Sequence, residues 1–481
     1  MSRSPDLSRR GLIHSMAAGS ILMPGLLSEL LAGEAAPGGA NASSADPLAP
    51  RAPHFPARAK RVIFLHMSGG VSHVESWDPK PKLVADAGKT ITVPEFQGRK
   101  GSFEMFLKGP QWKFAPHGKS GTEVSELFPH MARQVDDLCV IRSMKTDHTN
   151  HYEATLGIHT GSFTFARPSL GSWVSYGLGT ENRNLPSFVV IAPQSPYAGN
   201  QVWGSDFLPG AHQGTRVVPG PEPIANVRRR SRSERLQAME LAALQAGNER
   251  HLAGRGVDPL LAARIKSFET AFGMQSEMPE AFDLAQESTE THALYGLEPG
   301  STQGFAWQCL VARRLAERGV RFIELIDVGS SANWDAHGDM LTHLPLAKNV
   351  DQPIAGLLQD LKRRGMLDDT LVVWTTEFGR TPFNAAAGAA GREHHHWVFS
   401  SWLAGGGVKG GITYGASDEH GIDVASDVVH VHDFHATILH LLGLDHTRLT
   451  WLGGVDYRSL LVRSPTGWSI NSPKTALVVH R

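Results

Sequence analysis

The sequence has little of several features that would each indicate a particular class of protein. It contains 2 cysteines among 481 residues, so disulfides do not form its scaffold. Cys139 and Cys309 lie in the apolar segments DDLCVI and WQCLVA, where we expect buried free thiols in preference to a bridge between them. The 46 Lys and Arg residues nearly balance the 47 Asp and Glu residues. This balance, without a long basic face, argues against nucleic acid as a partner.

Long apolar runs are also scarce. Beyond the N-terminus, no run reaches the roughly 18 residues that a bilayer-spanning helix needs, so we expect no transmembrane segment in the mature chain. The N-terminus reads SRRGL, with Arg9 and Arg10 directly before a moderately apolar run from Ile13 to Leu31. This pattern is typical of a twin-arginine export signal. An ordinary amphipathic first helix is the alternative interpretation.

The export interpretation divides the beginning of the chain. Cleavage after Ala40-Asn41-Ala42 would make residues 1–42 the signal peptide and residues 43–59 a linker rich in proline and alanine. The expected partner is the twin-arginine export machinery, which transports folded proteins that often carry a metal or cofactor. The mature protein is then expected to be soluble and periplasmic or extracellular.

Residues 60–463 are expected to form one α/β domain. The segment RVIFLHMSGG, from Arg61 to Gly70, predicts a first buried strand. Similar runs recur at LCVIRS, SFVVIA, RFIELI and LVVWTT, and stretches of helical character lie between them at ELFPHMARQV and FAWQCLVARRLAERG. This alternation predicts a mostly parallel sheet with helices on both faces. Residues 223–300 predict a helical excursion at one end of the sheet, and residues 464–481 a C-terminal tail.

The 24 histidines are the compositional excess, and several stand near carboxylates after apolar runs. Ligand sites of open parallel sheets lie beyond the carboxyl ends of the strands. In WDAH, Asp335 and His337 are two residues apart, which lets both bind one metal ion. TEFGRT places Glu377 and Arg380 after a predicted strand, and GREHHHW offers His394 as the first of three imidazoles. Each motif alone is also compatible with a solvated loop, but together they predict a metal site.

Two further places carry groups suited to substrate binding. The first strand runs into a glycine-rich turn with Ser68 and His73, and Asp78 follows. The segment RPSLGSW contains Arg167, whose guanidinium is suited to a two-pronged contact with an anionic ester group. Arg380 is suited to the same contact, and pairing within the core is the alternative for Arg167.

Several long strings carry a resemblance to a known family, domain of unknown function 1501. They cover residues 61 to 456 and read RVIFLHMSGGVSHVESWDPKP, TEVSELFPHMA, RPSLGSWVSYGLG, ARRLAERGVRFIEL, WDAH, TEFGRTP, GREHHHWVFSSWLAGGGVKGGITYGASDEHG and HATILHLLGLDH. That family is similar in fold to the alkaline phosphatase superfamily, which includes sulfatases and phosphodiesterases. The resemblance implies one or two divalent metals and a Ser, Thr or formylglycine nucleophile.

The residues match the superfamily pattern only in part. The resemblance implies Asp335 and His337 as ligands of one metal and His394 as the histidine that closes that site. Glu377 stands in place of a superfamily aspartate, but Phe378 occupies the place of the histidine that follows it. Ser68 occupies the place of the first-strand aspartate.

The nucleophile register is the clearest departure from the pattern. Counted back from Thr160-Gly161, this register falls on His151, where no hydroxyl or formylglycine motif is present. A covalent sulfatase mechanism is therefore not expected.

Two hypotheses follow for function. The first is a metal-dependent hydrolase of phosphate or sulfate esters, acting on a small molecule or a polysaccharide without a covalent nucleophile. His151, Glu377 and Arg380 would serve catalysis, with His151 as a base or a ligand. A divalent metal, zinc, manganese or calcium, would be bound by side chains that include Glu377 at a second position. The second hypothesis is a binding or surface-associated protein that keeps the fold and a metal site without turnover.

Overall fold

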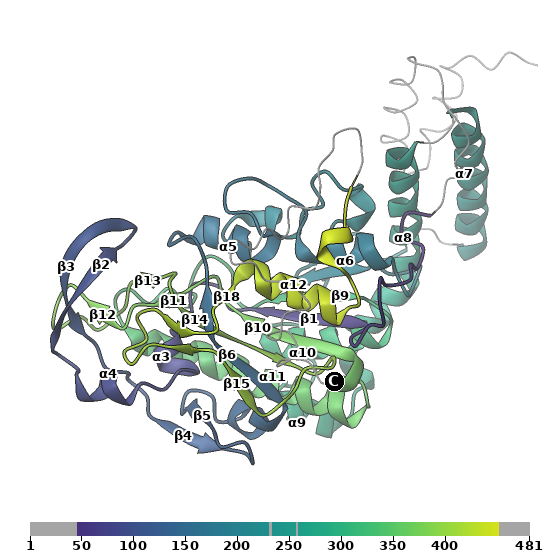
Figure 1. Ribbon diagram of the computed structural model, residues 1–481. Coiled ribbons are helices and arrows are strands. Elements are labelled where there is room, and N and C mark those ends of the chain that lie inside the picture. The colour runs from purple at the N-terminus through teal and green to yellow at the C-terminus, as the bar shows by residue number, and fades with distance from the viewer. Residues whose placement is uncertain (1–45, 230–232, 256–257, 452–481) are drawn as a thin grey trace, which may run out of the picture. The chain divides into compact units, whose positions relative to one another are not determined.

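The computed structural model describes residues 46–229, 233–255 and 258–451 (Figure 1). The predicted signal peptide and C-terminal tail lie outside the described residues. The chain divides into two units, residues 45–239 with 259–481, and residues 1–44 with 240–258. In the second unit, the described residues lie mainly in the C-terminal part of helix α7 (Glu234–Arg255). Apart from α7, the features below belong to the first unit.

A nine-stranded sheet forms the centre of this unit, in the order β15-β6-β14-β10-β1-β9-β7-β8, with β18 paired to β6. Only β14 runs antiparallel to its neighbours, so the predicted mostly parallel sheet is confirmed. The strands are β1 (Arg61–His66), β6 (Leu138–Lys145), β7 (Phe188–Ile191), β8 (Thr215–Val217), β9 (Phe322–Ile326), β10 (Thr370–Thr375), β14 (Phe399–Ala404), β15 (Ile412–Tyr414) and β18 (Val429–His430).

The apolar runs became strands because both faces of the sheet are covered. In β1, Val62 and Phe64 belong to one hydrophobic core and Ile63 and Leu65 to the other. Successive side chains of a strand point to opposite faces, so a strand buried on both faces reads as a continuous apolar run. β1 lies between β9 and β10 and its residues are almost all buried, which confirms the predicted buried strand.

Helices cover both faces of the sheet (Figure 1). One core contains apolar side chains of α10 (Gly304–Glu317) and α11 (His343–Arg363). The other contains those of α5 (His151–Thr160), α6 (Leu170–Leu178) and α12 (Val431–Leu441). The predicted helical excursion contains α7, α8 (Pro259–Phe282) and α9 (Thr289–Tyr295).

Short elements complete this unit. They are helices α3 (His73–Ser76) and α4 (Pro81–Ala85), and strands β2 (Thr90–Phe96), β3 (Arg99–Leu107), β4 (Phe114–His117), β5 (Thr122–Ser125), β11 (Gly379–Arg380), β12 (Phe383–Asn384), β13 (His394–His395), β16 (Ala416–Ser417) and β17 (Val424–Ser426), with 3₁₀ helices at Met131–Asp137, Gly199–Trp203, Gly210–His212, Leu284–Gln286, Met340–Thr342, Leu367–Asp369 and His446–Arg448.

One predicted helix was wrong in type and extent. The second half of the stretch ELFPHMARQV begins a 3₁₀ helix, Met131–Asp137, and no α-helix forms over it. Pro129 lies inside the stretch, and a proline removes one backbone donor and clashes with the preceding turn of an α-helix. The backbone N–H groups of His130 and Met131 instead donate to the carboxylate of Asp351, each at 2.8 Å.

The predicted free thiols are confirmed, since Cys139 and Cys309 are both buried and unpaired.

Candidate metal centre

The candidate residues gather where parallel strands end. The neighbouring strands β1, β9 and β10 run in one direction, so their carboxyl ends lie at the same edge of the sheet. Glu377 follows β10 and Asp335 lies in the loop after β9. His394 reaches them through β13, which pairs with β11 so that Arg380 lies opposite His394.

A Gly-Gly turn after β1 closes against this edge. The N–H of Gly69 donates to Oε1 of Glu377 at 2.8 Å. Both glycines have positive φ, +111° at Gly69 and +83° at Gly70, where other residues are strained. A Cβ atom at Gly69 would lie 2.7 Å from the backbone nitrogen of Trp334, and one at Gly70 would lie 2.7 Å from the ring of Phe378. Glycine is therefore required at both positions.

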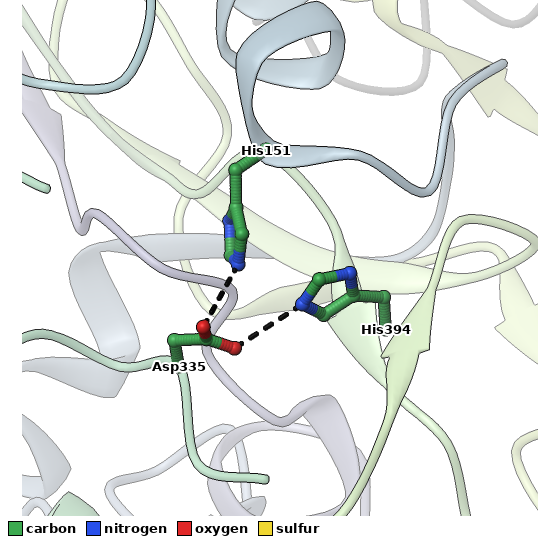
Figure 2. Close-up of side chains that lie close together, drawn as sticks. All are labelled: His151, Asp335 and His394. Carbon is green, nitrogen blue, oxygen red and sulfur yellow. Dashed lines mark hydrogen bonds and ion pairs between the residues drawn. The ribbon is translucent and has the colours of Figure 1, made fainter. Parts of the chain in front are cut away.

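Three side chains point toward one another at this edge (Figure 2). His151, Asp335 and His394 each offer one ligand atom, and these atoms lie within 4.8 Å of one another. The Nε2 of His151 lies 3.2 Å from Oδ2 of Asp335, and the Nε2 of His394 lies 3.2 Å from Oδ1. His151 is the first residue of α5, whose start is fixed by Asn150 accepting a hydrogen bond from the N–H of Tyr152.

The partner of Nδ1 determines the tautomer of each imidazole, and so whether Nε2 presents a lone pair to Asp335. The Nδ1 of His394 lies 2.6 Å from the carbonyl oxygen of Thr149, which can only accept, so Nδ1 carries the proton. The Nδ1 of His151 lies 2.7 Å from Oε1 of Glu377 and donates in the same way. In the neutral imidazoles both Nε2 lone pairs then face a carboxylate. Such an arrangement requires a cation, either a proton or a metal ion.

His337 lies at the rim of this group. Its Nδ1 lies 2.8 Å from Oε2 of Glu393, and its Nε2 lies 2.9 Å from Oδ1 of Asp335 and 2.9 Å from Nε2 of His394. Its side chain is 40% exposed, whereas that of His151 is 10% exposed. His151, expected as a base or a ligand, thus lies in the same group as Asp335 and His394, and Glu377 lies behind His151.

The pKa values reflect the charges that meet here. Burial alone would raise the pKa of Asp335, but hydrogen bonds from the three histidines hold it well below its usual range. Burial would also raise the pKa of Glu377, but the hydrogen bond from His151 lowers it to about 2. Both carboxylates are therefore ionised at neutral pH. Burial lowers the pKa of His151, but pairing with the two carboxylates outweighs this effect and raises it.

Arg380 is used within the protein. Its Nε donates to the carbonyl of Gly70 at 3.0 Å and its Nη1 to that of Arg392 at 3.3 Å. Its Nη2 donates to the carbonyl of Gly69 and, at 2.5 Å, to Oδ1 of Asp335. The guanidinium is fully buried, with four of its five N–H donors engaged in these contacts. It orients Asp335 and offsets its charge.

A family model described as "Protein of unknown function (DUF1501)" matches residues 59–459. The chain belongs to DUF1501. No curated protein sequence matches this DUF1501 chain.

Solved structures similar to the DUF1501 chain share little sequence with it. Ps i-CgsB in complex with k-i-k-neocarrahexaose is 10% identical, with a TM-score of 0.37 and coverage of 81% of this chain and 73% of that chain. The lipoteichoic acid synthase LtaP from Listeria monocytogenes is 11% identical, with a TM-score of 0.35 and coverage of 84% and 78%. Alkaline phosphatase from the Antarctic bacterium TAB5 is 11% identical, with a TM-score of 0.32 and coverage of 81% and 99%. Likenesses at this level carry no information about activity or metal.

Among its described residues, the DUF1501 chain has no helix that is both long enough and apolar enough to cross a bilayer.

Three of the predicted site residues of the DUF1501 chain form no hydrogen bond or ion pair with the histidines and carboxylates of the site within the part of the chain that the structure describes. Ser68 follows β1 at the same edge of the sheet, but its side chain is fully buried. His73 is buried in α3, with Nε2 2.9 Å from the carbonyl oxygen of Gly421. Arg167 is partly buried, and no described residue forms a hydrogen bond or ion pair with it.

Sequence reasoning missed two features of this DUF1501 site. Tyr197, in the loop after β7, stacks on the ring of His151. Behind Glu377, the Nε2 of His159 lies 2.7 Å from Oε1 of Glu324, and both side chains are buried. The glutamate inside the apolar run RFIELI was the available signal for the buried pair. A loop tyrosine among other loop residues gives no comparable signal.

Proposed function

We propose that this protein is a metal-dependent hydrolase of phosphate or sulfate esters. The observation that carries the proposal is the pair of imidazoles whose Nε2 lone pairs face the carboxylate of Asp335. The Nε2 of His151 is buried, and the contact that the described residues give it is with a carboxylate oxygen, Oδ2 of Asp335 at 3.2 Å, as expected of an atom that binds a cation. Two imidazole nitrogens and one carboxylate suit zinc or manganese better than calcium, which prefers oxygen ligands.

The side chains have separate roles in this proposal. His151, Asp335 and His394 would hold the cation, with His337 at the rim. When bound, a divalent cation would offset the charge of an anionic ester and lower the pKa of a water molecule. Glu377 and the carbonyl of Thr149 hold the two imidazoles in the tautomer that ligation needs. Arg167, whose guanidinium has no partner among the described residues, is the proposed anchor for the anionic group.

The test is a metal count on the purified protein combined with a panel of phosphate and sulfate esters. We expect about one tightly bound divalent ion per chain by native mass spectrometry, and turnover of at least one ester that stops when the metal is chelated. Absence of a bound metal would contradict the proposal.

A second function is favoured by Phe378. This residue is fully buried, and its ring lies 4.8 Å from that of His151 and 4.6 Å from that of His394, between centroids. An apolar ring therefore packs against both histidines where the superfamily pattern has another ligand. A protein that binds a metal or a surface without turnover fits this observation. Bound metal without turnover of any ester would favour that function over the hydrolase.

We further propose export by the twin-arginine pathway, which would place the site in the periplasm or outside the cell. Replacing both Arg9 and Arg10 with lysine is expected to block export, because this pathway recognises the guanidinium pair and not charge alone. Cell fractionation with immunoblotting would measure the result. The single variant Arg3→Lys, outside the SRRGL motif, is the control and should be exported normally. Normal export of the double variant would contradict the assignment.

A further inference from the structure

Tyr197 covers one face of the candidate metal centre. It lies in the loop after β7, and its ring is nearly parallel to the imidazole of His151, 9° between planes and 4.2 Å between centroids. Its side chain is partly exposed. A ring stacked this closely on a buried ligand holds its own hydroxyl in a defined place next to the site.

Asn333 fixes the position of that hydroxyl. The amide nitrogen of Asn333 donates to the carbonyl of Gly329 at 3.1 Å and to Oη of Tyr197 at 3.0 Å. Its amide oxygen accepts from the backbone N–H of Asp335 at 3.1 Å. Because the Gly329 carbonyl can only accept, the orientation of the amide is unambiguous. One side chain therefore ties the phenol oxygen to the backbone of Asp335.

The hydroxyl proton of Tyr197 is left available. Its oxygen accepts from Asn333, and no acceptor for its hydrogen is present among the residues that the structure describes. A tyrosine hydroxyl can donate one hydrogen bond while it accepts another. The site thus has an oriented hydrogen-bond donor that none of the described residues accepts.

We propose that the Tyr197 hydroxyl donates its proton to the leaving oxygen of an ester bound at His151, Asp335 and His394. This inference rests on the proposed hydrolase function. The bond between phosphorus or sulfur and the ester oxygen breaks, and a water oxygen bonds to the phosphorus or sulfur in its place. The departing alkoxide takes the tyrosine proton, the water releases one proton to solvent, and the tyrosinate regains a proton from solvent.

The proposal names a substrate class. A phenol is a weak acid, so its proton helps most when the leaving oxygen is strongly basic, as in an alkyl or sugar alcohol. An acidic leaving group such as nitrophenol departs without such help. The site is therefore built for esters of weakly acidic alcohols.

The experiment compares Tyr197→Phe with wild type on two esters of the same acid, one of methanol and one of 4-nitrophenol. Phenylalanine keeps the stacked ring and removes only the hydroxyl. We expect kcat/KM for the methyl ester to fall by about 10²–10⁴-fold, the usual contribution of general acid catalysis, and that for the nitrophenyl ester to change little. Tyr152→Phe is the matched control. Tyr152 lies on α5, is 43% exposed, and its hydroxyl accepts a hydrogen bond from the side-chain amide of Gln201. This variant should leave both values unchanged.

Each other outcome overturns the inference. An equal fall for both esters, or loss of bound metal by mass spectrometry, would show that the ring only positions His151. No change for either ester would show that the hydroxyl has no role. Failure of wild type to hydrolyse these two esters or any other ester of the panel, with metal bound, would instead contradict the hydrolase function itself and the inference with it.

Discussion

Replacing His394 or His151 with alanine is expected to reduce bound metal well below one ion per chain while the sheet stays folded. Each variant removes one of three ligand atoms that lie within 4.8 Å of one another. Loss of an outer partner of a metal ligand typically costs 10–100-fold in affinity, and loss of a ligand costs more. Metal content by native mass spectrometry and ester turnover should therefore fall together, with circular dichroism unchanged.

His396→Ala is the matched control for this prediction. His396 directly follows β13, but its Nε2 lies 3.9 Å from Oε1 of Glu95 and has no contact with Asp335 among the described residues. Its removal should leave the metal content near that of wild type. We expect His337→Ala to have an intermediate effect, because His337 touches Asp335 and His394 from the rim. Similar metal contents in all four variants would contradict the proposed centre.

Replacing Glu75 with alanine is expected to destabilise the protein by about 3–5 kcal/mol. The Nε and Nη2 atoms of Arg392 donate to Oε1 of Glu75 at 2.9 Å and 2.7 Å, and both side chains are fully buried. Without the carboxylate, the guanidinium would remain buried without its counter-ion. Arg392 lies two residues before His394, so the same pair ties α3 to the segment that carries the proposed ligand. The free energy of unfolding from denaturant titration measures the effect.

An exposed ion pair provides the comparison for this stability prediction. Lys362 contacts Asp137 at 2.7 Å with its side chain 60% exposed. Because solvent screens such pairs, Lys362→Ala should cost less than about 1 kcal/mol. If Glu75→Ala destabilises the protein no more than Lys362→Ala does, the buried pair does not have the role assigned to it.

The fold was largely predictable because it depends on local sequence patterns, the apolar runs and their alternation with helical stretches. The runs around β1, β6, β7, β9 and β10 have apolar residues at consecutive positions, as expected of strands buried on both faces. The alternation with helices implied parallel pairing, and parallel pairing placed the residues after β9 and β10 at one edge. Asp335 and Glu377 were therefore found from their positions after strands. The helix predicted for ELFPHMARQV was wrong because Pro129 interrupts an α-helix there.

The identity of the ligands depended on contacts between distant segments. Three adjacent histidines look alike in GREHHHW, yet His394 faces Asp335, His395 contacts the carbonyl of Ile422, and His396 faces Glu95. The pairing of β13 with β11 decides which of them reaches the site.

The same dependence explains the remaining features of the site. The sequence left His151 as a base or a ligand, and its place beside Asp335 follows from the start of α5 next to Glu377. Its tautomer depends on that carboxylate, and the tautomer of His394 on the carbonyl of Thr149. The local pattern of apolar and polar residues indicates burial and secondary structure, since these depend largely on a residue and its neighbours in the chain. The direction in which a lone pair or a hydroxyl points depends on atoms far away in the chain, so only the folded structure determines it.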